Sequence, residues 1–320
     1  MKISSKADLI NFASNKGYRP EILEKVCLLL DFAEQIKSSK IIRETLVLKG
    51  GTAINLFCTK ELPRLSVDLD FNYIGSLELD KMRSDREKIS DVILDNAAKL
   101  NMSVRRNPQR HAGSKAVLVY NSLMGNKGHI EIDINYMYRV PIWSITSGYP
   151  APWLKQIDLP ILDIHELAAG KLKALFERDA SRDLYDSYQL LTKWDLDVNK
   201  LRTSFVLYVA MSNLKWDSIS LDMISHNVDD IRKKLIPVLH KDTITSYYHN
   251  KIEEWVAEII SECKKRLKTL LPLNNNELEF LRLIQEEGII KPNLLSNDAD
   301  LCQRILKHPL INWKAQKSVA

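Results

Sequence analysis

The chain lacks the features that mark several common protein classes. It has four cysteines among 320 residues and no CxxC pair, which argues against a zinc site or a disulfide framework. No run of about 18 apolar residues is present, and charges interrupt the N-terminal segment before an apolar run of signal-peptide type. P-loop, GxGxxG, GxSxG and HExxH motifs are missing too. We therefore expect a cytoplasmic protein with no membrane partner, and the missing motifs weaken the case for an ATPase, a dehydrogenase or a hydrolase.

The charge balance excludes little. The formal net charge is +5 and the pI is about 8.8, which is compatible with a nucleic-acid partner but does not require one. A basic stretch from Arg105 to Lys115 is suited to a phosphate backbone, although such stretches are more often solvated surface. An apolar content of 45% with 27% charged residues is ordinary for a globular protein.

The two halves of the chain have different patterns. The first half predicts an α+β or α/β sheet domain, because short apolar runs alternate with segments of helical periodicity. The expected helices are 20–38, 52–58 and 80–100, and the expected strands are 46–49, 67–73, 115–121 and 128–137. A proline-rich loop over residues 141–160 precedes a stretch in which helical patterns dominate, and this stretch opens with Asp163 and Glu166 at the spacing of a capping box. We expect a sheet-containing domain over residues 1–160 and a helical domain over residues 161–320.

The segment from Leu46 to Tyr73 holds the first candidate site. A Gly50-Gly51 turn lets backbone N–H groups approach a phosphate, and the helix predicted from Thr52 adds a favourable dipole. Asp68 and Asp70 occupy alternate positions of an apolar strand, so both carboxylates point to one face of a sheet. Paired carboxylates hold the metal ions that assist phosphoryl transfer.

The alternative interpretation is a turn and two strand-edge aspartates without function. Short motifs of this kind match by chance often. A carboxylate is disfavoured in an apolar strand, however, which brings the functional hypothesis level with the structural one. Asp133, in the later predicted strand HIEIDINYM, points away from its apolar neighbours and is a candidate third metal ligand. Taken alone, Asp133 is more typical of a half-exposed strand.

A second group of charges follows in the helical half. Lys171 and Arg178 are seven residues apart, two turns of a helix, so we expect them to share a helix face. A lysine ammonium is a suitable point charge for a triphosphate, and Asp183 is placed to orient a base, a nucleophile or Lys171 itself. A solvated helix face with local ion pairs explains the same residues, and taken alone it is the better explanation.

In this order the motifs resemble a known family. They are Gly50-Gly51-Thr52, Arg64-x-Ser66-x-Asp68-x-Asp70, Asp133, Lys171 and Arg182-Asp183. The chain is similar to the AbiEii/AbiGii-type nucleotidyltransferase toxins, which include the MenT group and belong to the DNA polymerase β-like superfamily. The resemblance covers roughly residues 40 to 195. It implies a minimal polymerase-β-like core, a small mixed sheet with helices, followed by a helical C-terminal domain that contributes Lys171 and Asp183 to the site.

The resemblance also implies roles for individual residues. Asp68 and Asp70 bind Mg²⁺ or Mn²⁺, with Asp133 as the third metal ligand. The triphosphate of an NTP co-substrate is held by Gly50, Gly51, Thr52, Ser66 and Lys171. Ser66, Asp68, Asp70, Lys171 and Asp183 form the catalytic set. Lys49, just before the turn, is a further candidate phosphate contact.

The implied reaction is transfer of NMP to an RNA acceptor. MenT-type members attach nucleotides, often pyrimidines, to the tRNA 3′ end, and abortive-infection members have been linked to GTP binding. We therefore expect a toxin of a type IV toxin–antitoxin or abortive-infection system, with an antitoxin protein as a separate partner. Two alternatives stay open. One is transfer of the γ-phosphate to a protein or to a serine of the chain itself, such as Ser66. The other is an inactive module that binds RNA or protein.

Overall fold

The computed structural model describes residues 3–106, 113–247 and 252–318, and it divides into two compact units. The first unit comprises Met1–Arg139, Ile145–Leu162 and Ile236–Ser246. The second unit comprises Val140–Ser144, Asp163–Leu235 and Tyr247–Ala320. The chain therefore passes from one unit to the other more than once. Residues 107–112 of the predicted basic stretch lie outside the described residues.

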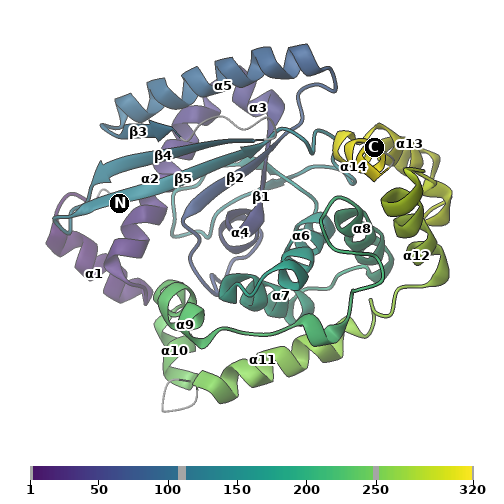
Figure 1. Ribbon diagram of the computed structural model, residues 1–320. Coiled ribbons are helices and arrows are strands. Elements are labelled where there is room, and N and C mark those ends of the chain that lie inside the picture. The colour runs from purple at the N-terminus through teal and green to yellow at the C-terminus, as the bar shows by residue number, and fades with distance from the viewer. Residues whose placement is uncertain (1–2, 107–112, 248–251, 319–320) are drawn as a thin grey trace. The chain divides into compact units, whose positions relative to one another are not determined.

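A mixed sheet of seven strands forms the first unit (Figure 1). Its spatial order is β3-β4-β5-β2-β1-β7-β6. The strands are β1 (Leu46–Lys49), β2 (Asp68–Tyr73), β3 (Ser103–Arg106), β4 (Gly113–Asn121), β5 (Lys127–Asn135), β6 (Thr146–Gly148) and β7 (Leu159–Ile161). β2 lies in the middle, antiparallel to β1 and parallel to β5. The predicted α+β class with a small mixed sheet is confirmed.

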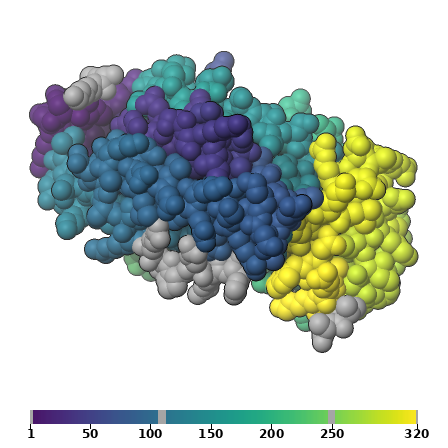
Figure 2. Space-filling view, turned by 90° about the horizontal axis from the view of Figure 1, so that it is seen from above, coloured from purple at the N-terminus to yellow at the C-terminus, as the bar shows by residue number. Residues whose placement is uncertain are grey.

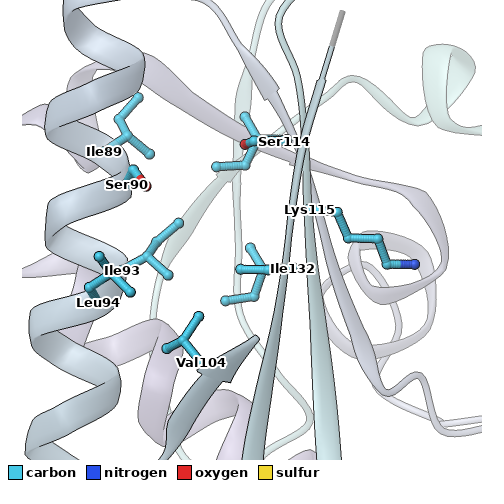
Figure 3. Close-up of a pocket in the computed structure, with 10 residues that line it drawn as sticks. Ile89, Ser90, Ile93, Leu94, Val104, Ser114, Lys115 and Ile132 are labelled. Atoms are coloured by element: carbon cyan, nitrogen blue, oxygen red, sulfur yellow. The ribbon is translucent and has the colours of Figure 1, made fainter. Parts of the chain in front are cut away.

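The two faces of the sheet differ because the strand residues alternate. On β2, Leu69 is 0% exposed and Phe71 is 3% exposed, whereas the intervening Asp68 and Asp70 are half-buried. The helix α5 (Leu79–Lys99) places Ile89 and Ile93 in the core of this unit. Figure 3 shows these two side chains facing Ile132 across a small cavity, while Lys115 points from its strand to the opposite side. The apolar face thus fixes the strand register, and the polar face is left for other groups.

The other elements of the first unit surround the sheet and include a segment that returns late in the chain. They are α1 (Lys6–Lys16), α2 (Pro20–Lys37), α3 (Lys40–Thr45), α4 (Gly50–Thr52), η1 (Ala53–Phe57), η4 (Ile236–Val238) and α10 (Lys241–Tyr247). Figure 2 shows the outer side of α5, in blue, at the molecular surface.

Arg64 is 1% exposed, and it forms a β-bridge with Leu239 in the returning segment. This buried bridge holds the chain just before Ser66 and Asp68.

The second unit consists of helices, as the sequence predicts. They are α6 (Ile164–Glu177), α7 (Ser181–Lys193), α8 (Val198–Ala210), η2 (Leu221–Met223), α9 (Val228–Asp230), η3 (Ile231–Leu235), α11 (Ile252–Leu267), α12 (Asn275–Arg282), η5 (Leu283–Glu287), η6 (Pro292–Leu294), α13 (Ala299–Lys307) and α14 (Pro309–Ser318). Within residues 3–106, 113–247 and 252–318, none of the helices has both the length and the apolar character that crossing a membrane requires.

The start of α6 differs from the capping box that the spacing of Asp163 and Glu166 predicts. Asp163 caps the helix, because its carboxylate accepts a hydrogen bond from the His165 N–H at 2.8 Å. Glu166 instead accepts a hydrogen bond from the Trp143 N–H at 2.9 Å. Glu166 is 1% exposed, and burial raises its pKa to about 8. It therefore holds the segment Val140–Ser144 against α6 rather than capping the helix.

Glu166→Gln should make the protein more stable at pH 8 and remove part of its pH dependence. The folded pKa of Glu166, about 8, lies above its ordinary value of 4.5, so the folded state binds a proton that the unfolded state lacks between these values. The wild type therefore loses stability as pH rises through this window. Glutamine keeps the acceptor for Trp143 and does not titrate.

Urea unfolding from pH 5 to pH 8 measures the effect. The stability advantage of Glu166→Gln should grow with pH to roughly 2–4 kcal/mol. The exposed substitution Glu253→Gln is the control and should show no such trend. A constant difference between Glu166→Gln and the wild type across the range would contradict the assignment.

Candidate functional site

Four carboxylates lie on one face of the sheet, on two neighbouring strands. In the parallel pairing of β2 with β5, Asp68 is opposite Glu131 and Asp70 is opposite Asp133. Residues in register share a face, so these four side chains, the carboxylate row, point to the same side. Lys115 on β4 opposes Asp133 in the antiparallel pairing and joins them. Asp68, Asp70 and Asp133 therefore lie on neighbouring strands, as the sequence predicts.

The charges of the row act on each other. Burial raises the pKa of Asp133, and the nearby Asp70 carboxylate raises it further. The ammonium groups of Lys49 and Lys115 act in the opposite direction but do not cancel the rise. A carboxyl group with a raised pKa beside a second carboxylate indicates a place where added positive charge is favourable.

The donor set of the row suits a hard divalent cation. Carboxylate oxygens are the ligands that Mg²⁺ prefers, and it is usually held by one or two of them together with substrate phosphates and water. Asn72 continues the row on β2, and its buried amide oxygen has no hydrogen-bond partner within the described residues. No three His, Cys, Asp or Glu side chains of these residues converge into a ready-made metal cage. The chemistry therefore fits a cation whose coordination is completed by phosphate rather than a closed protein site.

Gly50 leaves room for the row. It follows β1 directly, with φ of 70°, a left-handed conformation that suits glycine. A Cβ atom at this position would lie 2.5 Å from Oδ2 of Asp70, closer than real contacts allow. Lys49, the residue before it, is in register with Asp70. The turn therefore brings bare backbone against a candidate metal ligand. Gly51 follows, buried in the short helix α4.

A buried hydroxyl pair supports the start of β2. The Thr52 and Ser66 hydroxyl oxygens are 3.0 Å apart, and the Thr52 hydroxyl also donates to the main-chain carbonyl of Asp68. Thr52 is 0% exposed and Ser66 is 5% exposed. These contacts tie the glycine turn to the strand that carries Asp68.

The other two predicted site residues, Lys171 and Asp183, lie in the second unit and pair with each other. Nζ of Lys171 on α6 is 2.8 Å from Oδ1 of Asp183 and 2.8 Å from Oδ2 of Asp186, both on α7. Nη2 of Arg178 is 2.7 Å from Oδ2 of Asp183. Arg178 does not share a helix face with Lys171, because α6 ends at Glu177 and Arg178 has an extended backbone. The two cations meet through Asp183 instead.

Two neighbouring cations stabilise the ionised form of the Asp183 carboxylate. Its burial alone would raise its pKa, but the charges of Lys171 and Arg178 outweigh that effect and keep the pKa below its ordinary value. Asp186 is 0% exposed. Lys171 is thus fixed between two buried carboxylates, with only 12% of its side chain exposed.

Three residues that the sequence brings to notice were not assigned to the site from the sequence. Asp186 follows Asp183 by three residues, a helix spacing that predicts a shared partner. Glu131 shares the strand face of Asp133, and alternation alone gives that. Lys115 belongs to the basic stretch, but its place beside the carboxylates depends on which strands pair. The local sequence does not determine strand pairing.

Comparison with known proteins adds independent information. A family model for the nucleotidyl transferase AbiEii toxin, type IV toxin–antitoxin system, matches residues 38–269. Among solved structures, the nucleotidyltransferase toxin MenT4 from Mycobacterium tuberculosis H37Rv aligns with a TM-score of 0.58 at 17% identity, over 95% of this chain and 99% of its own. A candidate nucleotidyltransferase from H. pylori aligns with a TM-score of 0.47 at 17% identity, over 78% of this chain and 98% of its own. No curated protein sequence matches.

The MenT4 likeness supports the fold described above, and the family match supports the activity. The matched residues include the glycine turn, the carboxylate row and the Lys171–Asp183–Asp186 cluster. Because the match spans well over half of the sequence, the chain belongs to the AbiEii family of nucleotidyltransferase toxins of type IV toxin–antitoxin systems.

Proposed function

We propose that this nucleotidyltransferase transfers NMP from an NTP to an RNA acceptor such as the tRNA 3′ end, with Mg²⁺ or Mn²⁺ held at the carboxylate row. One observation carries the proposal: the strand register sets Asp70 beside Asp133. Next to them is Gly50, where any side chain would collide with the Asp70 carboxylate. Nucleotidyltransferases of this family use an NTP and a divalent metal, and the row has the oxygen ligands for it.

Each residue of the proposed site has a distinct task. Asp68 and Asp70 hold the metal, with Asp133 as a third ligand. A bound metal ion would neutralise phosphate charge there. The backbone of Gly50 and Gly51 receives the triphosphate, and the buried Thr52–Ser66 pair fixes the turn against β2. The acceptor hydroxyl attacks the α-phosphate in line and pyrophosphate leaves.

We further propose that Lys171 supplies positive charge to the triphosphate. The alternative, a purely structural ion pair, is consistent with the same contacts, so the two are separated by experiment below. Asp183 and Asp186 would then orient the ammonium group, since each accepts from it at 2.8 Å. As a toxin of this family the chain is expected to act in the cytoplasm and to be controlled by a separate antitoxin protein.

Transfer of label from an α-labelled NTP to total tRNA tests the reaction. The wild type with Mg²⁺ should label RNA with at least one of the four NTPs, and γ-labelled NTP should label neither RNA nor protein. Asp70→Asn and Asp68→Ala should each reduce transfer by on the order of 100-fold or more, because they remove a metal ligand. Label that arrives only from the γ-position would favour phosphotransfer, and the burial of Ser66 already disfavours that serine as acceptor.

Gly50→Ala should abolish most transfer without unfolding the protein. The new methyl group would displace the Asp70 carboxylate, and the left-handed backbone adds about 1–2 kcal/mol of strain. Gly125→Ala is the matched control, because Gly125 also has a positive φ, of 96°, but has open space at the Cβ position. Both variants should lose similar stability in urea unfolding. Equal transfer activity of the two variants would show that Asp70 does not need the space at Gly50.

Lys171→Met should destabilise the protein by roughly 3–5 kcal/mol, because it leaves Asp183 and Asp186 buried without their shared cation. Adding Asp183→Asn and Asp186→Asn should restore much of that stability, since the carboxylates are then neutral. Transfer activity should stay lost in the stable triple variant. Activity that returns together with stability, measured by urea unfolding and label transfer, would assign Lys171 a structural task only.

A further inference from the structure

Lys115 lies within the carboxylate row but is directed at one member of it. It projects from β4 on the face opposite the small cavity, as Figure 3 shows. Its Nζ is 2.5 Å from Oε2 of Glu131. That hydrogen bond is the main reason why the pKa of Lys115 is raised, and the more distant charges of Asp133 and Asp68 add to the rise. A single ammonium group is thus attracted to three carboxylates and is bonded to Glu131.

This placement matters for any cation that the row binds. A fixed ammonium group and a divalent metal compete for the same negative charge. If Lys115 paired with Asp133, its register neighbour, the carboxylate next to Asp70 would be neutralised before a metal arrived. Glu131 is the member of the row in register with Asp68 and farther along β5 from the Asp70–Asp133 pair.

We propose that Glu131 is a positioning residue that keeps the Lys115 ammonium group away from Asp133, so that a divalent cation binds the row without competition from this lysine. The inference rests on the proposed metal role of Asp68, Asp70 and Asp133. It gives Glu131 and Lys115 opposite effects on metal affinity, although they form one ion pair. If Glu131 acted only through its own charge, its removal would weaken metal binding whether or not Lys115 is present, whereas a positioning role requires Lys115.

Binding of Mn²⁺ alone to the full-length chain, without nucleotide, tests the inference. Water-proton relaxation enhancement measures it and is independent of activity. Glu131→Gln should weaken Mn²⁺ binding roughly threefold to tenfold, because Lys115 then turns to Asp133. Lys115→Met should strengthen it by a similar factor. Solvent screening keeps both effects modest, since the side chains are 37% and 35% exposed.

The exposed pair Lys40–Glu44 on α3 supplies matched controls. Its atoms are 3.7 Å apart, and Lys40→Met and Glu44→Gln change the net charge as the test variants do. These controls should leave Mn²⁺ binding unchanged, which separates a local effect from a change in overall charge. Circular dichroism melting should show that all four variants are folded, as expected for exposed or half-exposed side chains.

Two contrary results are distinguishable. Asp70→Asn is expected to weaken Mn²⁺ binding strongly. If Asp70→Asn leaves binding intact, the proposed metal site is wrong and this inference fails with it. Positioning predicts that Glu131→Gln has little effect in a Lys115→Met background. If Asp70→Asn weakens binding but Glu131→Gln weakens it as much in the Lys115→Met background as in the wild type, or not at all in either, the inference alone is overturned and the proposed function stands.

Discussion

Repulsion between carboxylates in register is the constraint on which the rest of this structure depends. Neighbouring strands lie about 4.8 Å apart, and two like charges at that separation would repel by about 3.5 kcal/mol at an effective dielectric constant of about 20. β2 and β5 place carboxylates in register twice, at Asp68 with Glu131 and at Asp70 with Asp133, and the Lys115 ammonium group offsets the charge of Glu131. The raised pKa of Asp133 is one response, and the nearby lysines are another. A row kept at this cost is well suited to bind positive charge.

Much of the fold follows from local sequence. The strand predicted over residues 46–49 is found as predicted, and the strand over 67–73 begins one residue later, because an apolar run marks the first and apolar alternation marks the second. The strands β6 and β7 were not predicted. Each has three residues within a proline-rich segment, too short for any period to show. The predicted capping box at α6 was half right, since Asp163 caps the helix but Glu166 accepts its hydrogen bond from the backbone N–H of Trp143.

The sequence predicted which residues belong to the candidate site better than it predicted which of them are in contact. The sequence indicated Asp68 and Asp70 because carboxylates are rare in apolar strands, and the family resemblance is confirmed by the match over residues 38–269. The parallel pairing that brings in Asp133 joins strands separated by α5 and a hairpin, so no local pattern predicts it. For Asp186 the spacing of three residues from Asp183 predicts a shared partner, but only the structure shows that this partner is Lys171 on another helix. The division of tasks among these residues stays a prediction.

A crystal structure with Mn²⁺ and a non-hydrolysable NTP analogue tests the central claim most directly. Anomalous scattering locates Mn²⁺ without reference to activity. The account predicts a manganese peak within bonding distance of the Asp68 and Asp70 carboxylates, with the triphosphate against the Gly50-Gly51 turn. A bound nucleotide whose manganese lies on other residues, with the carboxylate row empty, would contradict it.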